Sequence, residues 1–351
     1  MNLSSTTPLA FVHEAAPQRV VFAEGAVARV PEEAARLGIA RALLIATPGS
    51  GARLGQRLAD LLGERAAGLH ARAVLHVPRP IAEEASARAR AVGVDGLVAA
   101  GGGAAIGLAK IVARDTGLPI LAVPTTYSGS EITAIWGLSD GERKLTGKDA
   151  RVLPRTVVYD PELTLTLPAA VTAASAMNAL AHCIEGLWVA DRTPLLEVLA
   201  TDAARRLAQH LPRALADGGD RQARAECLIA AWLAGTVLSA GTALQHKLAH
   251  VLGGLGLPHA ETHAIILPHV TRFNLAAAPQ ARERLAAAVG EPPDARLFAM
   301  VRALPIPRRL SAVGLDRSKI DLVAREVAAL ALTTPRPVGA AEARALLEAA
   351  Y

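Results

Sequence analysis

Short apolar runs alternate with helical patterns over the first half of this 351-residue chain. Four runs predict buried strands, and they cover residues 42–46, 73–77, 94–100 and 120–123. Each of the first three is followed by a segment with apolar residues at helical spacing, which predicts a helix. Strands that alternate with helices are typical of a parallel sheet joined by right-handed crossovers. We therefore expect an α/β unit with a doubly wound parallel sheet.

The pattern changes near residue 168. From there almost to Tyr351, Ala-rich and Leu-rich helical patterns dominate, and strand-like alternation is nearly absent. The sequence therefore predicts two domains: an α/β domain over residues 1–160 and an all-α domain over residues 161–351.

Composition and charge exclude several classes of protein. No apolar stretch reaches the roughly 20 residues of a membrane helix, and residues 1–18 lack the pattern of a signal peptide. Two cysteines in helical patterns, Cys183 and Cys227, suggest reduced thiols. A basic cluster could indicate nucleic-acid binding, but aromatic residues make up only 3% and provide no stacking rings beside it. We expect a cytoplasmic protein that binds neither membrane nor nucleic acid. The basic cluster contains Arg143, Lys144, Lys148, Arg151 and Arg155.

Two turns follow predicted strands and have the residues of a nucleotide site. Gly101, Gly102 and Gly103 lie between a strand and a helix, where absent Cβ atoms let the backbone approach a phosphate at a helix N-terminus. A tight turn without ligand remains an alternative. The segment 124–131 follows the next strand and offers hydroxyls for ribose or phosphate oxygens, although Ser128 and Glu131 also have capping-box spacing.

Histidines are concentrated in one part of the chain. Five of the ten fall between His246 and His269. His246 and His250 are four residues apart and share one face of a predicted helix, and His259 follows after turn residues. His182 lies on an earlier predicted helix, one turn after Asn178. Side chains that converge in this way favour a metal site or a proton-transfer site.

These motifs together resemble the iron-containing alcohol dehydrogenase superfamily, and the resemblance spans nearly the whole chain. It implies a dinucleotide-binding N-terminal domain, a helical C-terminal domain of the dehydroquinate synthase-like fold, and a homodimer. It also implies a set of cofactor-binding positions. They are Thr47, Gly101, Gly102, Gly103, Ala104, Thr125, Thr126, Ser130 and Lys144.

One departure from the superfamily pattern concerns the metal. Members that hold iron or zinc have Asp, His, His and His as ligands, at positions that correspond to 178, 182, 246 and 259. Here the first is Asn178, and a neutral amide is a weaker ligand for a divalent cation than a carboxylate. The segments 142–155, 246–250 and 257–263 resemble the maleylacetate reductases of this superfamily. That resemblance implies reduction of 2-maleylacetate to 3-oxoadipate in the breakdown of aromatic compounds, with NADH or NADPH and no required metal.

The chemistry of such a reaction suits the residues. Hydride addition to a conjugated enone leaves an enolate, which hydrogen-bond donors can stabilise while an acid protonates the adjacent carbon. We predict that His182, His246, His250, His259 and Asn178 line the reaction site, with His246 or His250 as the proton donor. The substrate is a dicarboxylate, and the predicted substrate-binding residues are Lys247, Arg336, Arg151 and His263.

Cofactor preference has one indication in the sequence. Enzymes that select NAD often place a carboxylate after an early strand, where it binds the ribose and repels a 2′-phosphate. Residues 47–50 occupy that place and include no acid. We therefore expect both NADH and NADPH to be used.

Three other functions stay open at this stage. The first is a metal-dependent alcohol dehydrogenase in which His182, His246 and His259 suffice for zinc or iron. The second is a dehydroquinate-synthase-like lyase that retains NAD⁺. The third is a binding protein without catalytic activity.

Overall fold

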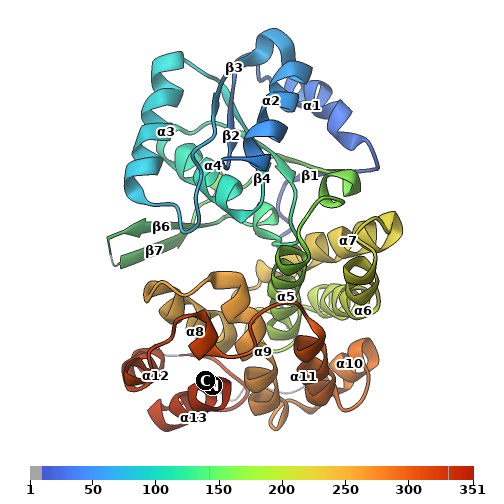
Figure 1. Ribbon diagram of the computed structural model, residues 1–351, viewed down its shortest axis with the longest axis vertical. Coiled ribbons are helices and arrows are strands. Elements are labelled where there is room, and N and C mark those ends of the chain that lie inside the picture. The colour runs from blue at the N-terminus through green and yellow to red at the C-terminus, as the bar shows by residue number, and fades with distance from the viewer. Residues whose placement is uncertain (1–9, 142, 331) are drawn as a thin grey trace. The chain divides into compact units, whose positions relative to one another are not determined.

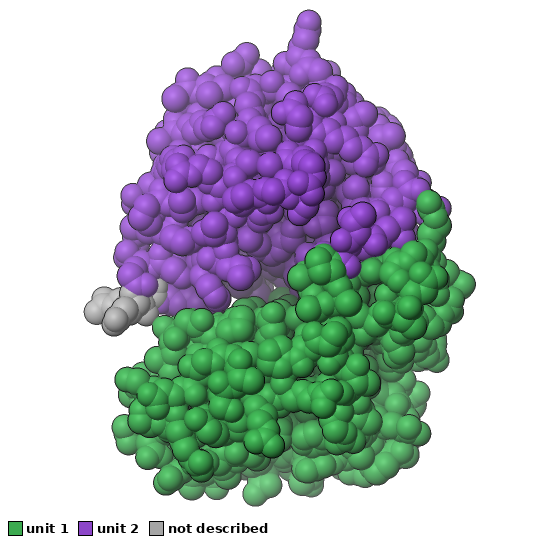
Figure 2. All heavy atoms as spheres, viewed as in Figure 1, with its two compact units in different colours: residues 1–14, 168–351 green, residues 15–167 purple. Residues whose placement is uncertain are grey.

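The computed structural model describes residues 10–141, 143–330 and 332–351; Glu142, which belongs to one of the segments used for the family resemblance, lies outside them. The chain divides into two units (Figure 2). Residues 15–167 form one of them. Residues 168–351 form the other, together with the described residues before residue 15. We call them the α/β unit and the helical unit.

The α/β unit contains a parallel sheet in the order β1-β8-β5-β4-β2-β3. Val, Ile and Leu fill most of its central positions, as expected of strands that are covered on both faces. The prediction of a doubly wound parallel sheet is confirmed. The six strands are β1 (Arg19–Phe22), β2 (Ala42–Ala46), β3 (Ala66–His70), β4 (Gly96–Gly101), β5 (Ile120–Pro124) and β8 (Thr156–Tyr159).

Helices cover both faces of this sheet (Figure 1). Successive residues of β2 point to opposite faces, so Leu43 and Ile45 pack with α3 and α4, whereas Leu44 and Ala46 pack with α1 and α2. β2 therefore contributes to two cores. The helices are α1 (Val30–Arg36), α2 (Ser50–Leu62), α3 (Arg79–Val92) and α4 (Gly103–Thr116).

The strand predicted over residues 73–77 is wrong. The strand at this place is β3, Ala66–His70, and the chain then runs as a loop into α3. His76 and Val77 have φ angles of 65° and 47°, which no extended strand can contain. Only Ala73 and Val77 of this run are buried in the core, whereas Val74 and Leu75 are exposed. The backbone carbonyl of Val77 accepts a hydrogen bond from the Ser139 N–H at 3.0 Å.

Three further regions of strand were not predicted: β1, β8 and a hairpin. β1 and β8 pair in parallel at one edge of the sheet. A separate antiparallel hairpin consists of β6 (Ile135–Asp140) and β7 (Arg143–Lys148). The capping-box spacing at Ser128 does not begin an α-helix, because Gly129 occupies the N-cap position of a short 3-10 turn, Ser130–Ile132.

The helical unit contains only helices among its described regular elements, as predicted. Apolar residues of α8, α9, α12 and α13 form one of its cores. Cys183 and Cys227 are both free and buried, as the sequence suggested. Across the described residues, no helix has the length and apolar character needed to cross a bilayer. The α-helices are α5 (Ala169–Gly186), α6 (Pro194–Ala216), α7 (Arg221–Leu238), α8 (Leu244–Gly254), α9 (His259–Leu275), α10 (Pro279–Val289), α11 (Pro293–Ala303), α12 (Ile320–Ala329) and α13 (Ala340–Ala350).

Candidate active site

Three helices of the helical unit bring five histidines together. α5 carries His182, α8 carries His246 and His250, and α9 carries His259 and His263. The three helices pack on one another. Asn178 lies one turn before His182 on α5, so the two side chains share a helix face. We call these five histidines the histidine cluster.

The imidazole rings of the cluster are in direct contact. The centroid of the His246 ring lies 4.8 Å from that of His182, 4.6 Å from that of His263 and 6.4 Å from that of His250. His259 closes the circuit, at 4.5 Å from His263 and 5.7 Å from His250. Of the predicted site residues, the structure therefore joins these five histidines in one chain of contacts.

A carboxylate orients His246. Nδ1 of His246 donates a hydrogen bond to Oε2 of Glu185, on α5. The other oxygen, Oε1, accepts the backbone N–H of Gln245 at 2.7 Å. This N–H belongs to the first turn of α8, whose free N–H groups favour an acceptor of negative charge. Glu185 therefore joins α5 to α8 and leaves Nε2 as the free nitrogen of His246.

An amide orients His263. Nε2 of Gln245 lies 3.0 Å from the backbone carbonyl oxygen of His263 and 3.2 Å from its Nδ1. Gln245 and His263 are both fully buried, at 1% and 0% exposure. Neither Gln245 nor a role for Glu185 was predicted. Glu185 falls three residues after His182 and so on the same face, but nothing in the sequence shows that Gln245 contacts a residue 18 positions away.

Burial keeps two of the histidines neutral. Desolvation, followed by the nearby imidazoles of His246 and His250, lowers the pKa of His182 well below its usual range. Desolvation also lowers the pKa of His263 well below that range, with further contributions from the four other histidines of the cluster. His182 and His263 therefore serve as uncharged hydrogen-bonding groups near neutral pH.

Several buried polar atoms around the cluster have no hydrogen-bond partner within the described chain. A buried polar atom left unpaired costs about 1–3 kcal/mol, so native proteins tolerate few of them. Their concentration here is typical of a site that binds a polar ligand. The atoms are Asn178 Oδ1, His182 Nδ1, Gln245 Oε1, His246 Nε2 and His263 Nε2.

The α/β unit has its own candidate site at the carboxyl ends of β2 and β4. The chain order reverses there, because β3 extends the sheet on one side of β2 and β4 returns to the other side. Open parallel sheets bind ligands at such a reversal. Thr47 directly follows β2, and Gly101 ends β4, so the sheet brings these two predicted residues to one edge.

Glycine is required by the geometry of this edge. Gly101 has a φ of 138°, which residues other than glycine rarely adopt. A Cβ on Gly102 would lie 2.7 Å from Cγ2 of Thr126, whereas a Cβ on Gly103 would meet no atom within 4 Å. Gly103 begins α4, with Ala104 next in its first turn and no acidic side chain there. A side chain could therefore be added at Gly103 without meeting the protein, whereas one at Gly102 could not.

A buried lysine holds the segment that follows β5. Nζ of Lys110, on α4, donates to the carbonyl oxygens of Ser130 and Ile135 at 2.6 and 2.8 Å, and to Oγ1 of Thr133 at 3.0 Å. Desolvation lowers the pKa of Lys110 to about 7, against an opposing effect of Glu131. Thr125 joins this segment to the glycine turn, because its N–H donates to the Gly101 carbonyl at 3.3 Å.

The remaining predicted residues take no part in the ring contacts of the cluster. Arg151 belongs to the α/β unit, is mainly exposed, and pairs with Asp149 at 2.7 Å. Lys144, on β7, is half-buried, and desolvation lowers its pKa. Lys247 follows His246 on α8 and is half-buried, and the exposed Arg336 stacks over the ring of Phe273 at 4.4 Å.

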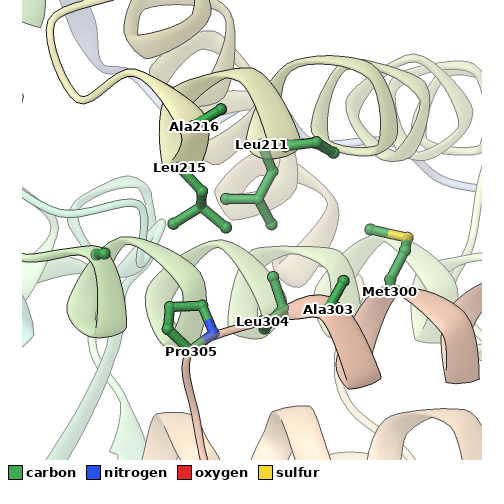
Figure 3. A pocket seen from close by; sticks show the side chains of 9 residues that line it. Leu211, Leu215, Ala216, Met300, Ala303, Leu304 and Pro305 are labelled. Carbon is green, nitrogen blue, oxygen red and sulfur yellow. The ribbon is translucent and has the colours of Figure 1, made fainter.

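A separate apolar cavity of about 480 Å³ lies elsewhere in the helical unit (Figure 3). Its walls come from the start of α5, the end of α6 and the end of α11 with the residues that follow. It contains no titratable side chain, so it lacks the chemistry of an active site. The lining residues are Ala169, Leu211, Pro212, Leu215, Ala216, Met300, Ala303, Leu304 and Pro305.

Comparison with known families decides the classification. Residues 172–351 match the Fe-containing alcohol dehydrogenase family, C-terminal, and residues 17–161 match Iron-containing alcohol dehydrogenase. The chain belongs to this family. The resemblance inferred from the sequence motifs is thereby confirmed, and the protein is an oxidoreductase.

Full-length relatives refine the classification. The chain is 45% identical to the maleylacetate reductase of Burkholderia cepacia, over 97% of this chain and 98% of the relative. It is 46% identical to maleylacetate reductase 2 of Cupriavidus pinatubonensis, over 97% and 96%. The crystal structure of maleylacetate reductase from Agrobacterium tumefaciens superimposes with a TM-score of 0.93 at 41% identity, covering 98% of this chain and 99% of that one.

The family's metal does not fit the residues as they are arranged here. A zinc or iron site needs several lone pairs directed at one point about 2.0–2.2 Å away. The rings of His182 and His246 are instead stacked, with an interplanar angle of 20°, so they present faces to each other. The bond from Nδ1 of His246 to Glu185 leaves only Nε2 of that ring as a possible ligand. Within the described ranges, no group of three or more His, Cys, Asp or Glu side chains is placed to hold a metal ion.

Proposed function

We propose that this oxidoreductase reduces the carbon–carbon double bond of 2-maleylacetate to give 3-oxoadipate, using NADH or NADPH and no required metal ion. The observation that carries the proposal is the histidine cluster, in which buried ring nitrogens without partners lie close to Asn178. The names of the full-length relatives support the choice of substrate, which links the enzyme to the breakdown of aromatic compounds.

The chemistry requires one hydride and one proton. Maleylacetate carries a double bond conjugated with a ketone, and hydride arrives at the carbon remote from the ketone. Charge then develops on the ketone oxygen, and a proton must reach the carbon between the two positions. Neutral N–H donors can stabilise that oxygen, and an imidazole can deliver the proton. A site built from histidines supplies both groups.

Individual roles follow from this chemistry. His246 or His250 donates the proton, and His182, His259 and Asn178 complete the wall of the reaction site. The substrate carries two carboxylates and needs cationic or N–H partners. Their candidates are Lys247, His263, Arg336 and Arg151, of which Arg151 already pairs with Asp149.

A bound nicotinamide dinucleotide supplies the hydride. The glycine turn at the N-terminus of α4 offers backbone N–H groups to its phosphates. Thr47 and Thr126 border this edge of the sheet, and Lys110 holds the segment that includes Ser130. The cofactor-binding set proposed for this purpose is Thr47, Gly101, Gly102, Gly103, Ala104, Thr125, Thr126, Ser130 and Lys144.

Metal independence is supported by the donor set. Asn178 stands where metal-binding members of the superfamily have aspartate, and among the described residues no three His, Cys, Asp or Glu side chains are placed to hold a metal ion. A cytoplasmic homodimer and a domain boundary near residue 160 stay predictions. Light scattering of the purified protein tests the dimer.

The test is steady-state kinetics with freshly prepared maleylacetate. We expect loss of reduced-nicotinamide absorbance with both NADH and NADPH, and mass spectrometry should identify 3-oxoadipate as the product. Simple alcohols with NAD⁺ serve as the comparison. Alcohol oxidation that depends on added zinc or iron, with no reduction of maleylacetate, would overturn the proposal in favour of a metal-dependent alcohol dehydrogenase.

A further inference from the structure

Two side chains, Glu185 and Gln245, set opposite hydrogen positions on His246 and His263. The partner of His246 Nδ1 is a carboxylate, which only accepts hydrogen bonds when ionised. Nδ1 of His246 must therefore carry a hydrogen, and Nε2 is the nitrogen left to exchange a proton. The partner of His263 Nδ1 is the side-chain amide of Gln245, which can donate a hydrogen bond where a carboxylate cannot.

The orientation of the Gln245 amide is fixed by a second contact. The amide atom that lies 3.2 Å from His263 Nδ1 also lies 3.0 Å from the backbone carbonyl oxygen of His263. A carbonyl oxygen cannot donate, so this amide atom must be the NH₂ nitrogen and not the oxygen. The same NH₂ group then donates to Nδ1, which must have a lone pair. The hydrogen of the neutral His263 ring consequently lies on Nε2.

We propose that Gln245 is a positioning residue that holds His263 in its Nε2–H tautomer, so that His263 donates a hydrogen bond to the substrate oxygen on which charge develops. The assignment rests on the proposed reduction of an enone. Nε2 of His263 is buried and has no partner within the described chain, so the donor is available to a ligand. The ring of His246 lies 4.6 Å away, centroid to centroid, and its Nε2 has no partner in the described chain either.

Rigid placement explains why an amide is used for this purpose. Gln245 is anchored at two points, because its backbone N–H donates to Glu185 and its side chain donates to His263. A donor held in place before the reaction needs no reorganisation when the oxyanion forms. An imidazole free to exchange tautomers would present a lone pair to that oxygen for part of the time, and repel it.

Nuclear magnetic resonance measures the tautomer directly. Histidine labelled with ¹⁵N gives two-bond ¹H–¹⁵N correlations that distinguish the two neutral forms, and a His263→Asn variant assigns the signal. We expect the Nε2–H form in the protein without substrate. An Nδ1–H form of His263 would overturn the inference, and because no substrate is present, this result is independent of the proposed function.

Two variants extend the test to catalysis. Gln245→Glu places an acceptor opposite Nδ1 and should convert His263 to the Nδ1–H form, with kcat for maleylacetate reduced about a hundredfold. Gln245→Leu removes the hydrogen bond to Nδ1. It should give a mixture of both tautomers of His263 and reduce kcat for maleylacetate about tenfold. KM for NADH should change little in either, and Gln222→Leu, at an exposed position on α7, is the matched control. Converted tautomers with unchanged kcat would overturn the role as donor.

Discussion

The glycine turn of the α/β unit and the histidine cluster of the helical unit differ in the chemical groups they offer to a ligand. At the turn, the groups proposed to bind the cofactor are backbone N–H groups, and the geometry requires the absence of side chains at Gly101 and Gly102. In the cluster, the groups proposed to act are side chains that come from α5, α8 and α9. Substitutions at the turn should therefore act by filling space, and substitutions in the cluster by removing chemistry.

The largest effect is expected from the cluster. His246→Asn removes an imidazole whose Nδ1 is held by Glu185 and which is a candidate proton donor. Loss of a general acid reduces rates by about 10² to 10⁴, so kcat for maleylacetate should fall by about a thousandfold. Parallel measurement of His250→Asn identifies which of the two donates the proton. His269→Asn, whose ring packs edge-on against Phe298, should retain activity. Near-normal kcat in both cluster variants would contradict the assignment.

An intermediate effect is expected from the glycine turn. Gly103→Ala adds a methyl group that meets no protein atom within 4 Å, so the fold should be unaffected. If cofactor phosphates approach this backbone, the methyl group should raise KM for NADH by about tenfold, which is about 1.4 kcal/mol of binding free energy. The melting temperature and KM for maleylacetate are the controls. An unchanged KM for NADH would place the phosphates elsewhere.

A smaller effect concerns Lys110 and pH. Burial lowers its pKa from 10.5 to about 7 in the folded protein. Between pH 7 and 10 the unfolded chain therefore binds more protons than the folded chain, and the free energy of unfolding rises with pH, by up to about 1.4 kcal/mol per unit. Lys110→Met lacks this group. Urea unfolding from pH 7 to pH 9 should thus give a steeper rise for the natural protein, and parallel slopes would contradict the lowered pKa.

The smallest effect concerns the choice between NADH and NADPH. No acid follows β2 at residues 47–50, so nothing at that place repels a 2′-phosphate. The two values of kcat/KM should agree within about tenfold. Thr47→Asp should move the preference towards NADH. Near-exclusive use of NADH by the natural protein would show that the discriminating group lies outside residues 47–50.

The two regions also differ in how far the sequence predicted them. The glycine turn follows a strong apolar run and opens a helix, so its position is encoded locally and β4 and α4 were found. Residues 73–77 also form an apolar run but lie in a loop, in which His76 and Val77 have positive φ angles and the Val77 carbonyl bonds to Ser139 of the hairpin. Local patterns cannot show such contacts.

Only part of the histidine cluster was predicted, because its other contacts join residues that are distant in the sequence. Helical spacing places His246 and His250 on one face, and turn residues before His259 suggest a return of the chain. The partners that orient the rings come from elsewhere: Glu185 from another helix and Gln245 from a position with no distinctive pattern. Residue types indicated the chemistry, and packing determined which nitrogen of each ring is free.

The most direct test of this account is turnover after removal of metal. The protein should be purified without chelator, divided, and one half chelated exhaustively, with iron and zinc measured in both halves. We predict equal rates of NADH consumption with maleylacetate in the two halves, because the reaction relies on the histidine cluster. A rate that disappears on chelation and returns with iron or zinc would contradict the account, and would mean that the rings rearrange around a metal ion.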